Sequence, residues 1–219
     1  MQGMITYFEQ PGPSNTEAVI QAVAERLGRE SGEKPEKECG TVIVASTSGL
    51  TALKFARALP NAKVICLSEP PSYAEVSGRW PTLQDRYIDG LKRLHADIVN
   101  TAPYVFHNYI GGGNEEQRLQ SLPQLSPEKN LREFLITVFG NGFKVAVEAI
   151  LMATSVGALK PYQPVIGVGG LHRGADTAIV ARSTFPNRLL SADPRKSFCV
   201  MEIIAMPIAK SANTRSRLS

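Results

Sequence analysis

The sequence contains few residues of the kinds that form cross-links or bind metals. Among its 219 residues there are three cysteines and three histidines. The cysteines are far apart and form no C-x-x-C pair, which argues against both a disulfide framework and a zinc site. The histidines do not have metal-ligand spacing either. We therefore expect no metal site and a reducing compartment. The residues concerned are Cys39, Cys66, Cys199, His95, His107 and His172.

Long apolar runs and a strong charge of one sign are also absent. No stretch of 18 apolar residues occurs, and the N-terminus has no basic segment followed by an apolar run, so we expect a cytoplasmic protein without a membrane partner. The net charge is only +4, from 24 Lys and Arg against 20 Asp and Glu. Basic residues do not gather with aromatic ones, which argues against nucleic acid as a partner. An anionic small molecule is the better candidate, and a homo-oligomer stays open.

What the sequence does contain is an alternation of β-branched runs and helical stripes. The pattern predicts an α/β fold, a three-layer sandwich with a mostly parallel sheet and antiparallel edge strands. Residues 1–207 are expected to form a single domain, and 208–219 a basic, flexible tail. Strands are predicted at 41–46, 63–68, 97–99, 164–170, 177–181 and 201–206, and helices at 15–29, 52–59, 83–95, from 131 onward and at 143–158.

Two connecting segments have no such pattern. Residues 29–40 are charged and contain glycine and proline, so they are expected to be an exposed connection. Residues 107–130 are the least regular part of the chain, and either an unstructured surface or a lid would fit.

A cluster of hydroxyl residues follows the predicted strand at 41–46 and precedes a helix. Free N–H groups at a helix start and the positive end of the helix dipole favour an anion, above all a phosphate. A plain Ser or Thr helix cap is the simpler interpretation, although four hydroxyls are more than a cap needs. The candidate residues are Ser46, Thr47, Ser48, Gly49 and Thr51.

A second candidate lies between the predicted strands at 164–170 and 177–181. Its glycines would let a ligand approach the backbone, and the Arg173 guanidinium matches phosphate oxygens. Asp176 could accept from a sugar hydroxyl or fix Arg173, and His172 is more plausible as a turn residue than as a base. A glycine-rich turn with exposed charges is the alternative. The candidate residues are Gly169, Gly170, Arg173, Gly174 and Asp176.

Residues able to perform catalysis are scarce. Neither a G-x-G-x-x-G motif nor a G-x-x-x-x-G-K-[ST] loop is present, which disfavours the corresponding nucleotide sites. Within the apolar helix, Glu148 is either a carboxylate at the edge of the apolar stripe, paired with Lys144 four residues earlier, or a buried acid. An enzyme would need a base or nucleophile facing the pocket, and the candidates for that role are His172, Glu148 and Cys66, of which Cys66 has the character of a core residue.

With both loops located, the chain resembles the superfamily of the pyruvate kinase C-terminal α/β domain. It is most similar to the stand-alone, largely uncharacterised proteins of this type from archaea and other microbes. The resemblance covers roughly half of the chain. It rests on YFEQPGPSNT at 7–16, TVIVASTSGLTALKFA at 41–56, FGNGFKVAVEAILMATSVGAL at 139–159, VIGVGGLHRGADTAIV at 165–180 and EIIAMP at 202–207.

This resemblance implies a ligand. In pyruvate kinases the loop similar to 46–51 holds a phosphate of the allosteric sugar bisphosphate, and a loop similar to 169–177 closes over it. In the stand-alone proteins the same pocket is associated with flavin mononucleotide (FMN). The resemblance therefore implies that the chain binds a phosphorylated small molecule, with FMN as the best candidate. The alternatives are a flavin-dependent or phosphometabolite enzyme, and a structural oligomer subunit with a vestigial pocket.

Pyruvate kinase activity itself is not expected. In pyruvate kinases the metal-binding carboxylates and the lysine lie on a separate barrel domain, which nothing in this sequence resembles. Asp85 and Asp89 could share one face of a helix, but such a pair is more often solvated than bound to magnesium.

Overall fold

The computed structural model describes residues 4–28, 40–106, 127–171 and 173–211. One seven-stranded sheet organises this part of the chain. Its strands are β1 (Thr6–Phe8), β2 (Thr41–Ala45), β3 (Lys63–Leu67), β4 (Asp97–Val99), β5 (Pro164–Gly169), β6 (Thr177–Arg182) and β7 (Cys199–Pro207). The helices are α1 (Thr16–Gly28), α2 (Leu50–Ala58), α3 (Ala74–Ser77), α4 (Asp85–Arg93), α6 (Pro127–Phe139) and α7 (Asn141–Ser155).

The strands follow the order β1-β7-β6-β5-β2-β3-β4. All pairs are parallel except β5 with β6 and β6 with β7, so β6 alone runs against the others. The expected mostly parallel sheet is confirmed. The expected antiparallel edge strands are wrong, because β6 lies inside the sheet and the edge strands β1 and β4 pair in parallel with their neighbours. The short turn from β5 forces β6 to be antiparallel, and β7 and the unpredicted β1 then extend the sheet beyond it.

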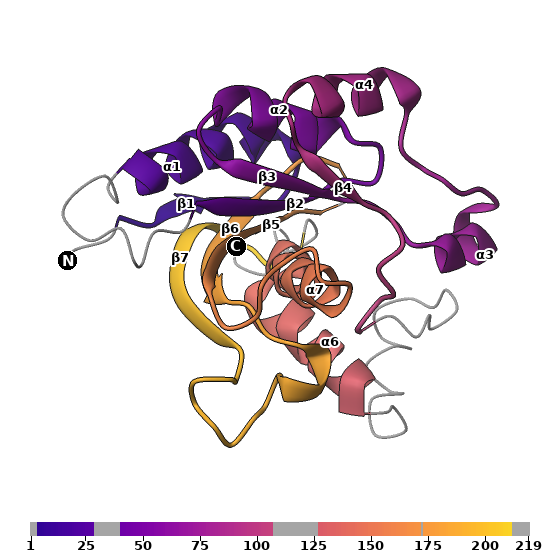
Figure 1. Ribbon diagram of the computed structural model, residues 1–219. Coiled ribbons are helices and arrows are strands. Elements are labelled where there is room, and N and C mark those ends of the chain that lie inside the picture. The colour runs from indigo at the N-terminus through magenta and orange to yellow at the C-terminus, as the bar shows by residue number, and fades with distance from the viewer. Residues whose placement is uncertain (1–3, 29–39, 107–126, 172, 212–219) are drawn as a thin grey trace.

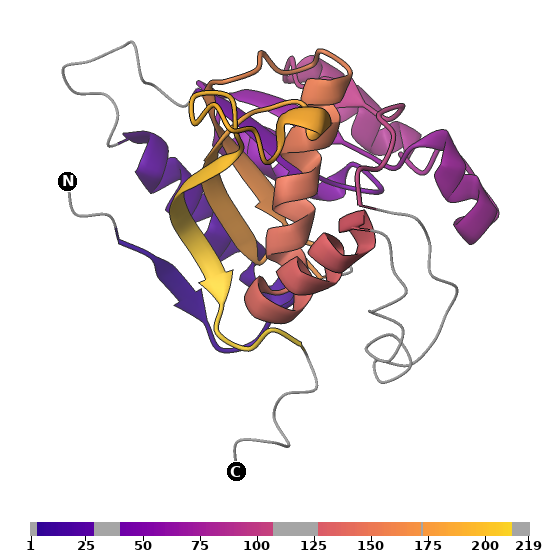
Figure 2. The ribbon, with the colours of Figure 1, turned by 90° about the horizontal axis from the view of Figure 1, so that it is seen from below.

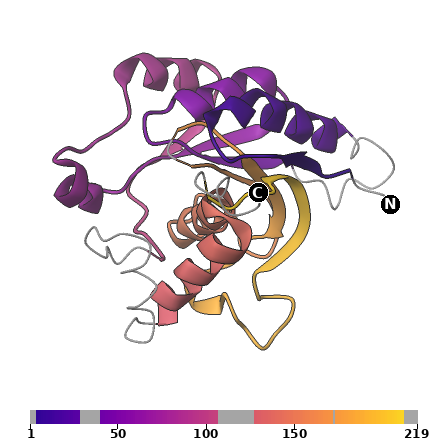
Figure 3. The same ribbon diagram turned by 180° about the vertical axis from the view of Figure 1, so that it is seen from behind.

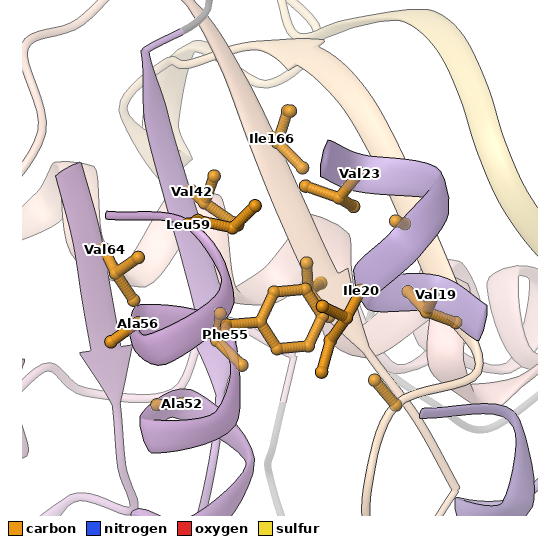
Figure 4. Close-up of a cluster of buried hydrophobic side chains, with 14 of the residues drawn as sticks. Val19, Ile20, Val23, Val42, Ala52, Phe55, Ala56, Leu59, Val64 and Ile166 are labelled. Carbon is orange, nitrogen blue, oxygen red and sulfur yellow. The ribbon is translucent and has the colours of Figure 1, made fainter. Parts of the chain in front are cut away.

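Helices cover both faces of the sheet, which confirms the expected three layers. Helices α1, α2 and α4 lie on one face, and α6 and α7 on the other (Figures 1 and 3). Strand β2 shows why a continuous apolar run fits this position: Val42 and Val44 pack in one core and Ile43 in the other, since successive side chains point to opposite faces. On the first face, the Phe55 ring of α2 points toward Ile20 of α1 (Figure 4).

Each strand and helix predicted above is present, and all but the strand at 97–99 have at least one shifted end. Helix α6 begins four residues earlier than expected, at Pro127. Of the predicted connection at 29–40 and the irregular segment at 107–130, residues 29–39 and 107–126 lie outside the described residues. Residues 127–130 belong to α6, so the prediction of an irregular segment is wrong for them. Of the predicted tail, 212–219 also lie outside them, whereas the amides of Ile208 and Ala209 donate to the carbonyls of Phe8 and Glu9 at 2.7 and 3.3 Å. None of the helices in the described part is both long and apolar enough to cross a bilayer.

Helix α7 lies against the sheet (Figure 2), and three glycines allow its backbone to approach closely. A Cβ on Gly167 would lie 2.7 Å from the Ile150 side chain. A Cβ on Gly169 would lie 2.2 Å from the Gly142 carbonyl oxygen, and one on Gly142 would lie 2.1 Å from the Asp176 carboxylate. Because these contacts involve backbone and buried groups, the close packing of α7 on β5 requires glycine.

We predict that Gly169→Ala lowers the free energy of unfolding by about 1–3 kcal/mol, since overpacking a close-packed contact strains the backbone. Gly28→Ala is the matched control, because a Cβ at the end of α1 would have nothing within 4 Å. Urea denaturation measures both variants. Equal stability of the two would contradict the assigned packing.

Candidate functional site

The two candidate loops meet because β2 and β5 are parallel neighbours. Val44 pairs with Val168, so the segments that follow both strands leave the sheet at the same edge. Between them lies a cavity of about 640 Å³. Seven of the ten candidate residues line it, namely Ser46, Thr47, Ser48, Thr51, Gly170, Arg173 and Gly174. The remaining three, Gly49, Gly169 and Asp176, do not line it.

The hydroxyl loop forms the start of α2. The Ser46 and Ser48 hydroxyl oxygens accept from the amides of Ala52 and Leu50, both at a long 3.4 Å. Gly49 has φ +93°, and a Cβ there would lie 3.2 Å from the side chains of Leu83 and Tyr87. Glycine is therefore required at this position by the turn and not by a ligand. The N-cap residue of α2 is Gly49, which makes no side-chain cap hydrogen bond, so the simpler interpretation of a Ser or Thr cap is wrong. The loop presents the hydroxyls of Ser46, Thr47, Ser48 and Thr51 to the cavity.

A carboxylate that the sequence did not single out lies beside this loop. Thr47 donates its hydroxyl to Glu69 Oε1 at 2.6 Å, and the Tyr104 hydroxyl donates to Glu69 Oε2. The Trp80 indole N–H donates to the Glu69 carbonyl at 2.9 Å. Burial, and then the neighbouring Glu69, raise the pKa of Tyr104. A signal for Glu69 was its position just after the buried strand at 63–68, at the same sheet edge.

Asp176 belongs to the packing around the second loop. It is fully buried, and its Oδ2 accepts from the amides of Gly12 at 3.0 Å and Leu171 at 3.1 Å, while Oδ1 accepts from the Thr177 hydroxyl at 2.8 Å. Burial raises the pKa of Asp176, and these three hydrogen bonds oppose that rise. Its carboxylate thus links the turn before α1 to the β5–β6 turn. The sequence suggests a sugar hydroxyl or Arg173 as its partner, and these three donors of the protein take that position instead.

Glycines of this loop are also required by contacts inside the protein. Gly174 has φ +75°, and a Cβ there would lie 2.4 Å from the Thr16 hydroxyl oxygen. A Cβ on Gly170 would lie 2.6 Å from the Gly174 carbonyl oxygen. The turn leaves Arg173 exposed at the cavity wall, and His172 lies outside the described residues.

The opposite wall comes from α7. Lys144 and Glu148 are only 2% and 3% exposed, and Lys144 Nζ lies 3.0 Å from Glu148 Oε2. The other oxygen, Glu148 Oε1, accepts from the amides of Phe106 at 2.8 Å and Val105 at 3.2 Å. The expected pairing of Glu148 with Lys144 is confirmed. Its expected position at the edge of the apolar stripe is wrong, because the carboxylate is buried as the alternative held. Burial lowers the pKa of Lys144, and Glu148 opposes that shift.

The cavity is more basic than the chain as a whole. Five basic side chains line it against two carboxylates, Glu69 and Glu148. Three tyrosines add aromatic surface. The basic residues are Arg79, Arg86, Arg132, Lys144 and Arg173, and the tyrosines are Tyr73, Tyr87 and Tyr104.

In the part of the chain that the structure describes, no group of three or more His, Cys, Asp or Glu residues could hold a metal ion. Asp85 and Asp89 belong to α4 and are not among the cavity residues. No known protein-family model matches the sequence.

We predict that Asp176→Ala lowers the free energy of unfolding by about 2–5 kcal/mol, because each buried donor left without an acceptor costs about 1–3 kcal/mol. Asp176→Asn keeps one oxygen for the Gly12 and Leu171 amides and should lose much less. Thermal and urea denaturation of both variants test this. A neutral effect of Asp176→Ala would show that the carboxylate does not hold the turn.

Proposed function

We propose that the cavity binds a phosphate-bearing small molecule. The observation that carries this proposal is the meeting of the hydroxyl loop at the start of α2 with Arg173 in a cavity where basic side chains outnumber carboxylates five to two. Backbone N–H groups at a helix start and a guanidinium are well suited to phosphate oxygens. The excess of positive charge favours a dianion over a neutral ligand.

FMN is our candidate for that ligand. A cavity of about 640 Å³ is in the usual range for cofactor-sized molecules, and the three tyrosines offer aromatic surface to a flavin ring. The resemblance of segments 41–56 and 165–180 to the pyruvate kinase C-terminal type of domain also implies FMN as the ligand. We propose membership of that superfamily on these grounds.

We predict that FMN binds and that riboflavin, which lacks the phosphate, binds at least about tenfold more weakly, the scale of a charge-assisted hydrogen bond of about 1.5–3 kcal/mol. Titration calorimetry compares the two ligands, and visible flavin absorbance in freshly purified protein would support the proposal further. Equal affinity would argue against a phosphate site. Failure of FMN with binding of another phosphorylated compound would exclude only the flavin.

We predict that Arg173→Ala weakens FMN binding by about 1.5–3 kcal/mol without unfolding the protein, since the lost contact is a charged hydrogen bond at an exposed position. Arg188→Ala is the matched control, because Arg188 is also exposed but does not line the cavity. Calorimetry with FMN measures both variants, and circular dichroism verifies folding. An unchanged affinity of the Arg173 variant would remove this residue from the site.

A further inference from the structure

The buried amine in the cavity wall, counted so far only among the basic groups of the proposed phosphate site, has chemistry of its own. Lys144 lies in the first turns of α7, is almost fully buried, and still lines the cavity together with Glu148. Only a molecule that enters the cavity can therefore reach its Nζ. An ammonium has three N–H donors, and the hydrogen bond to Glu148 at 3.0 Å uses one of them.

Burial makes this amine easier to deprotonate. Desolvation lowers the pKa of Lys144, and the nearby Arg132 acts in the same direction, whereas Glu148 and Glu69 oppose the shift. At 3.0 Å the ammonium proton can pass directly to Glu148. Transfer leaves a neutral amine beside a neutral carboxylic acid. Desolvation favours this neutral pair, whereas the amides of Val105 and Phe106 favour the carboxylate. A neutral lysine is a nucleophile toward carbonyl groups.

We infer that Lys144 forms an imine with a phosphorylated aldehyde or ketone bound in the cavity, and that Glu148 carries the protons of this reaction. The inference rests on the proposed function, because the phosphate site is what would hold the carbonyl compound near Nζ.

The chemistry needs no other reactant. Lys144 gives a proton to Glu148, and the free Nζ attacks the carbonyl carbon, so that a C–N bond forms and the C=O π bond breaks. Glu148 returns its proton to the oxygen, giving a carbinolamine. The nitrogen then loses a proton to Glu148, which passes it to the hydroxyl, and water leaves as the C=N bond forms. One carbonyl and one amine thus yield one imine and one water.

Borohydride trapping tests this inference on the full-length protein. Glycolaldehyde phosphate is the probe and glycolaldehyde, which lacks the phosphate, is the comparison. After reduction, peptide mass spectrometry should find Lys144 as the principal site, with labelling by the phosphorylated probe at least about tenfold above that by glycolaldehyde. Lys63 and Lys160 serve as internal controls, because they are exposed and line a different cavity at the other end of the strands.

Two variants distinguish the role of Lys144 as the nucleophile from that of Glu148 as the proton carrier. Lys144→Arg keeps a cation beside Glu148 and should lose the label at this position. Glu148→Gln keeps an acceptor for the Val105 and Phe106 amides and should slow labelling of Lys144 by about 100-fold, the lower end for general acid–base catalysis. Circular dichroism of both variants verifies folding.

Labelling of Lys144 no greater than that of Lys63 and Lys160 would overturn the inference, and so would equal labelling of Lys144 by both probes. Calorimetry with FMN on the same preparation reports separately on the phosphate site. Binding of FMN without selective labelling would therefore refute the imine and leave the proposed function in place.

Discussion

Parallel pairing of β2 with β5 is the constraint on which the cavity depends. In this register Val42 faces Ile166 and Val44 faces Val168, so the chain leaves both strands at one edge of the sheet. Strand β3 ends beside them and delivers Glu69 to the same edge. Helix α7 precedes β5 and runs in the opposite direction, so its first turns bring Lys144 there as well. A β5 oriented like β6 would place the Arg173 turn at the far end of the sheet, away from the start of α2.

Close packing of α7 on this strand pair then decides which loop residues remain available to a ligand. Gly169 is needed where the Gly142 carbonyl approaches, and Gly174 where the turn approaches Thr16. Asp176 has its oxygens engaged by three protein donors. What the second loop offers to the cavity is thus the Arg173 side chain and the backbone around it. The hydroxyls at the start of α2 line the same cavity, so the two loops would contribute different chemistry to the proposed anion site.

The sequence predicts the local elements well, because β-branched runs such as 41–46 and the stripe of α2 carry their own periodicity. It also locates both loops, since each follows a strand that the pattern identifies. The position of β6 inside the sheet was not predictable, because β1 has three residues and no pattern that would place it beyond β7. Glu69 and Tyr104 come together from segments 35 residues apart. Asp176 and Gly12 are 164 residues apart, and no local signal indicates that one accepts from the other.

The charges on α7 need a reason that packing does not supply. The amides of Val105 and Phe106 require an acceptor, and Glu148 provides one, yet a neutral glutamine could do the same. The need for an oxygen at this position therefore does not explain an ion pair that is almost fully buried. The free energy needed to desolvate two charges can exceed what their attraction contributes. Replacing such a buried pair with apolar residues therefore often leaves a protein equally stable or more stable. At a cavity wall such charges can act on an entering molecule, because solvent screens the interactions of buried groups only weakly. The cost of burying Lys144 and Glu148 thus supports the proposal that this pair acts on a bound molecule.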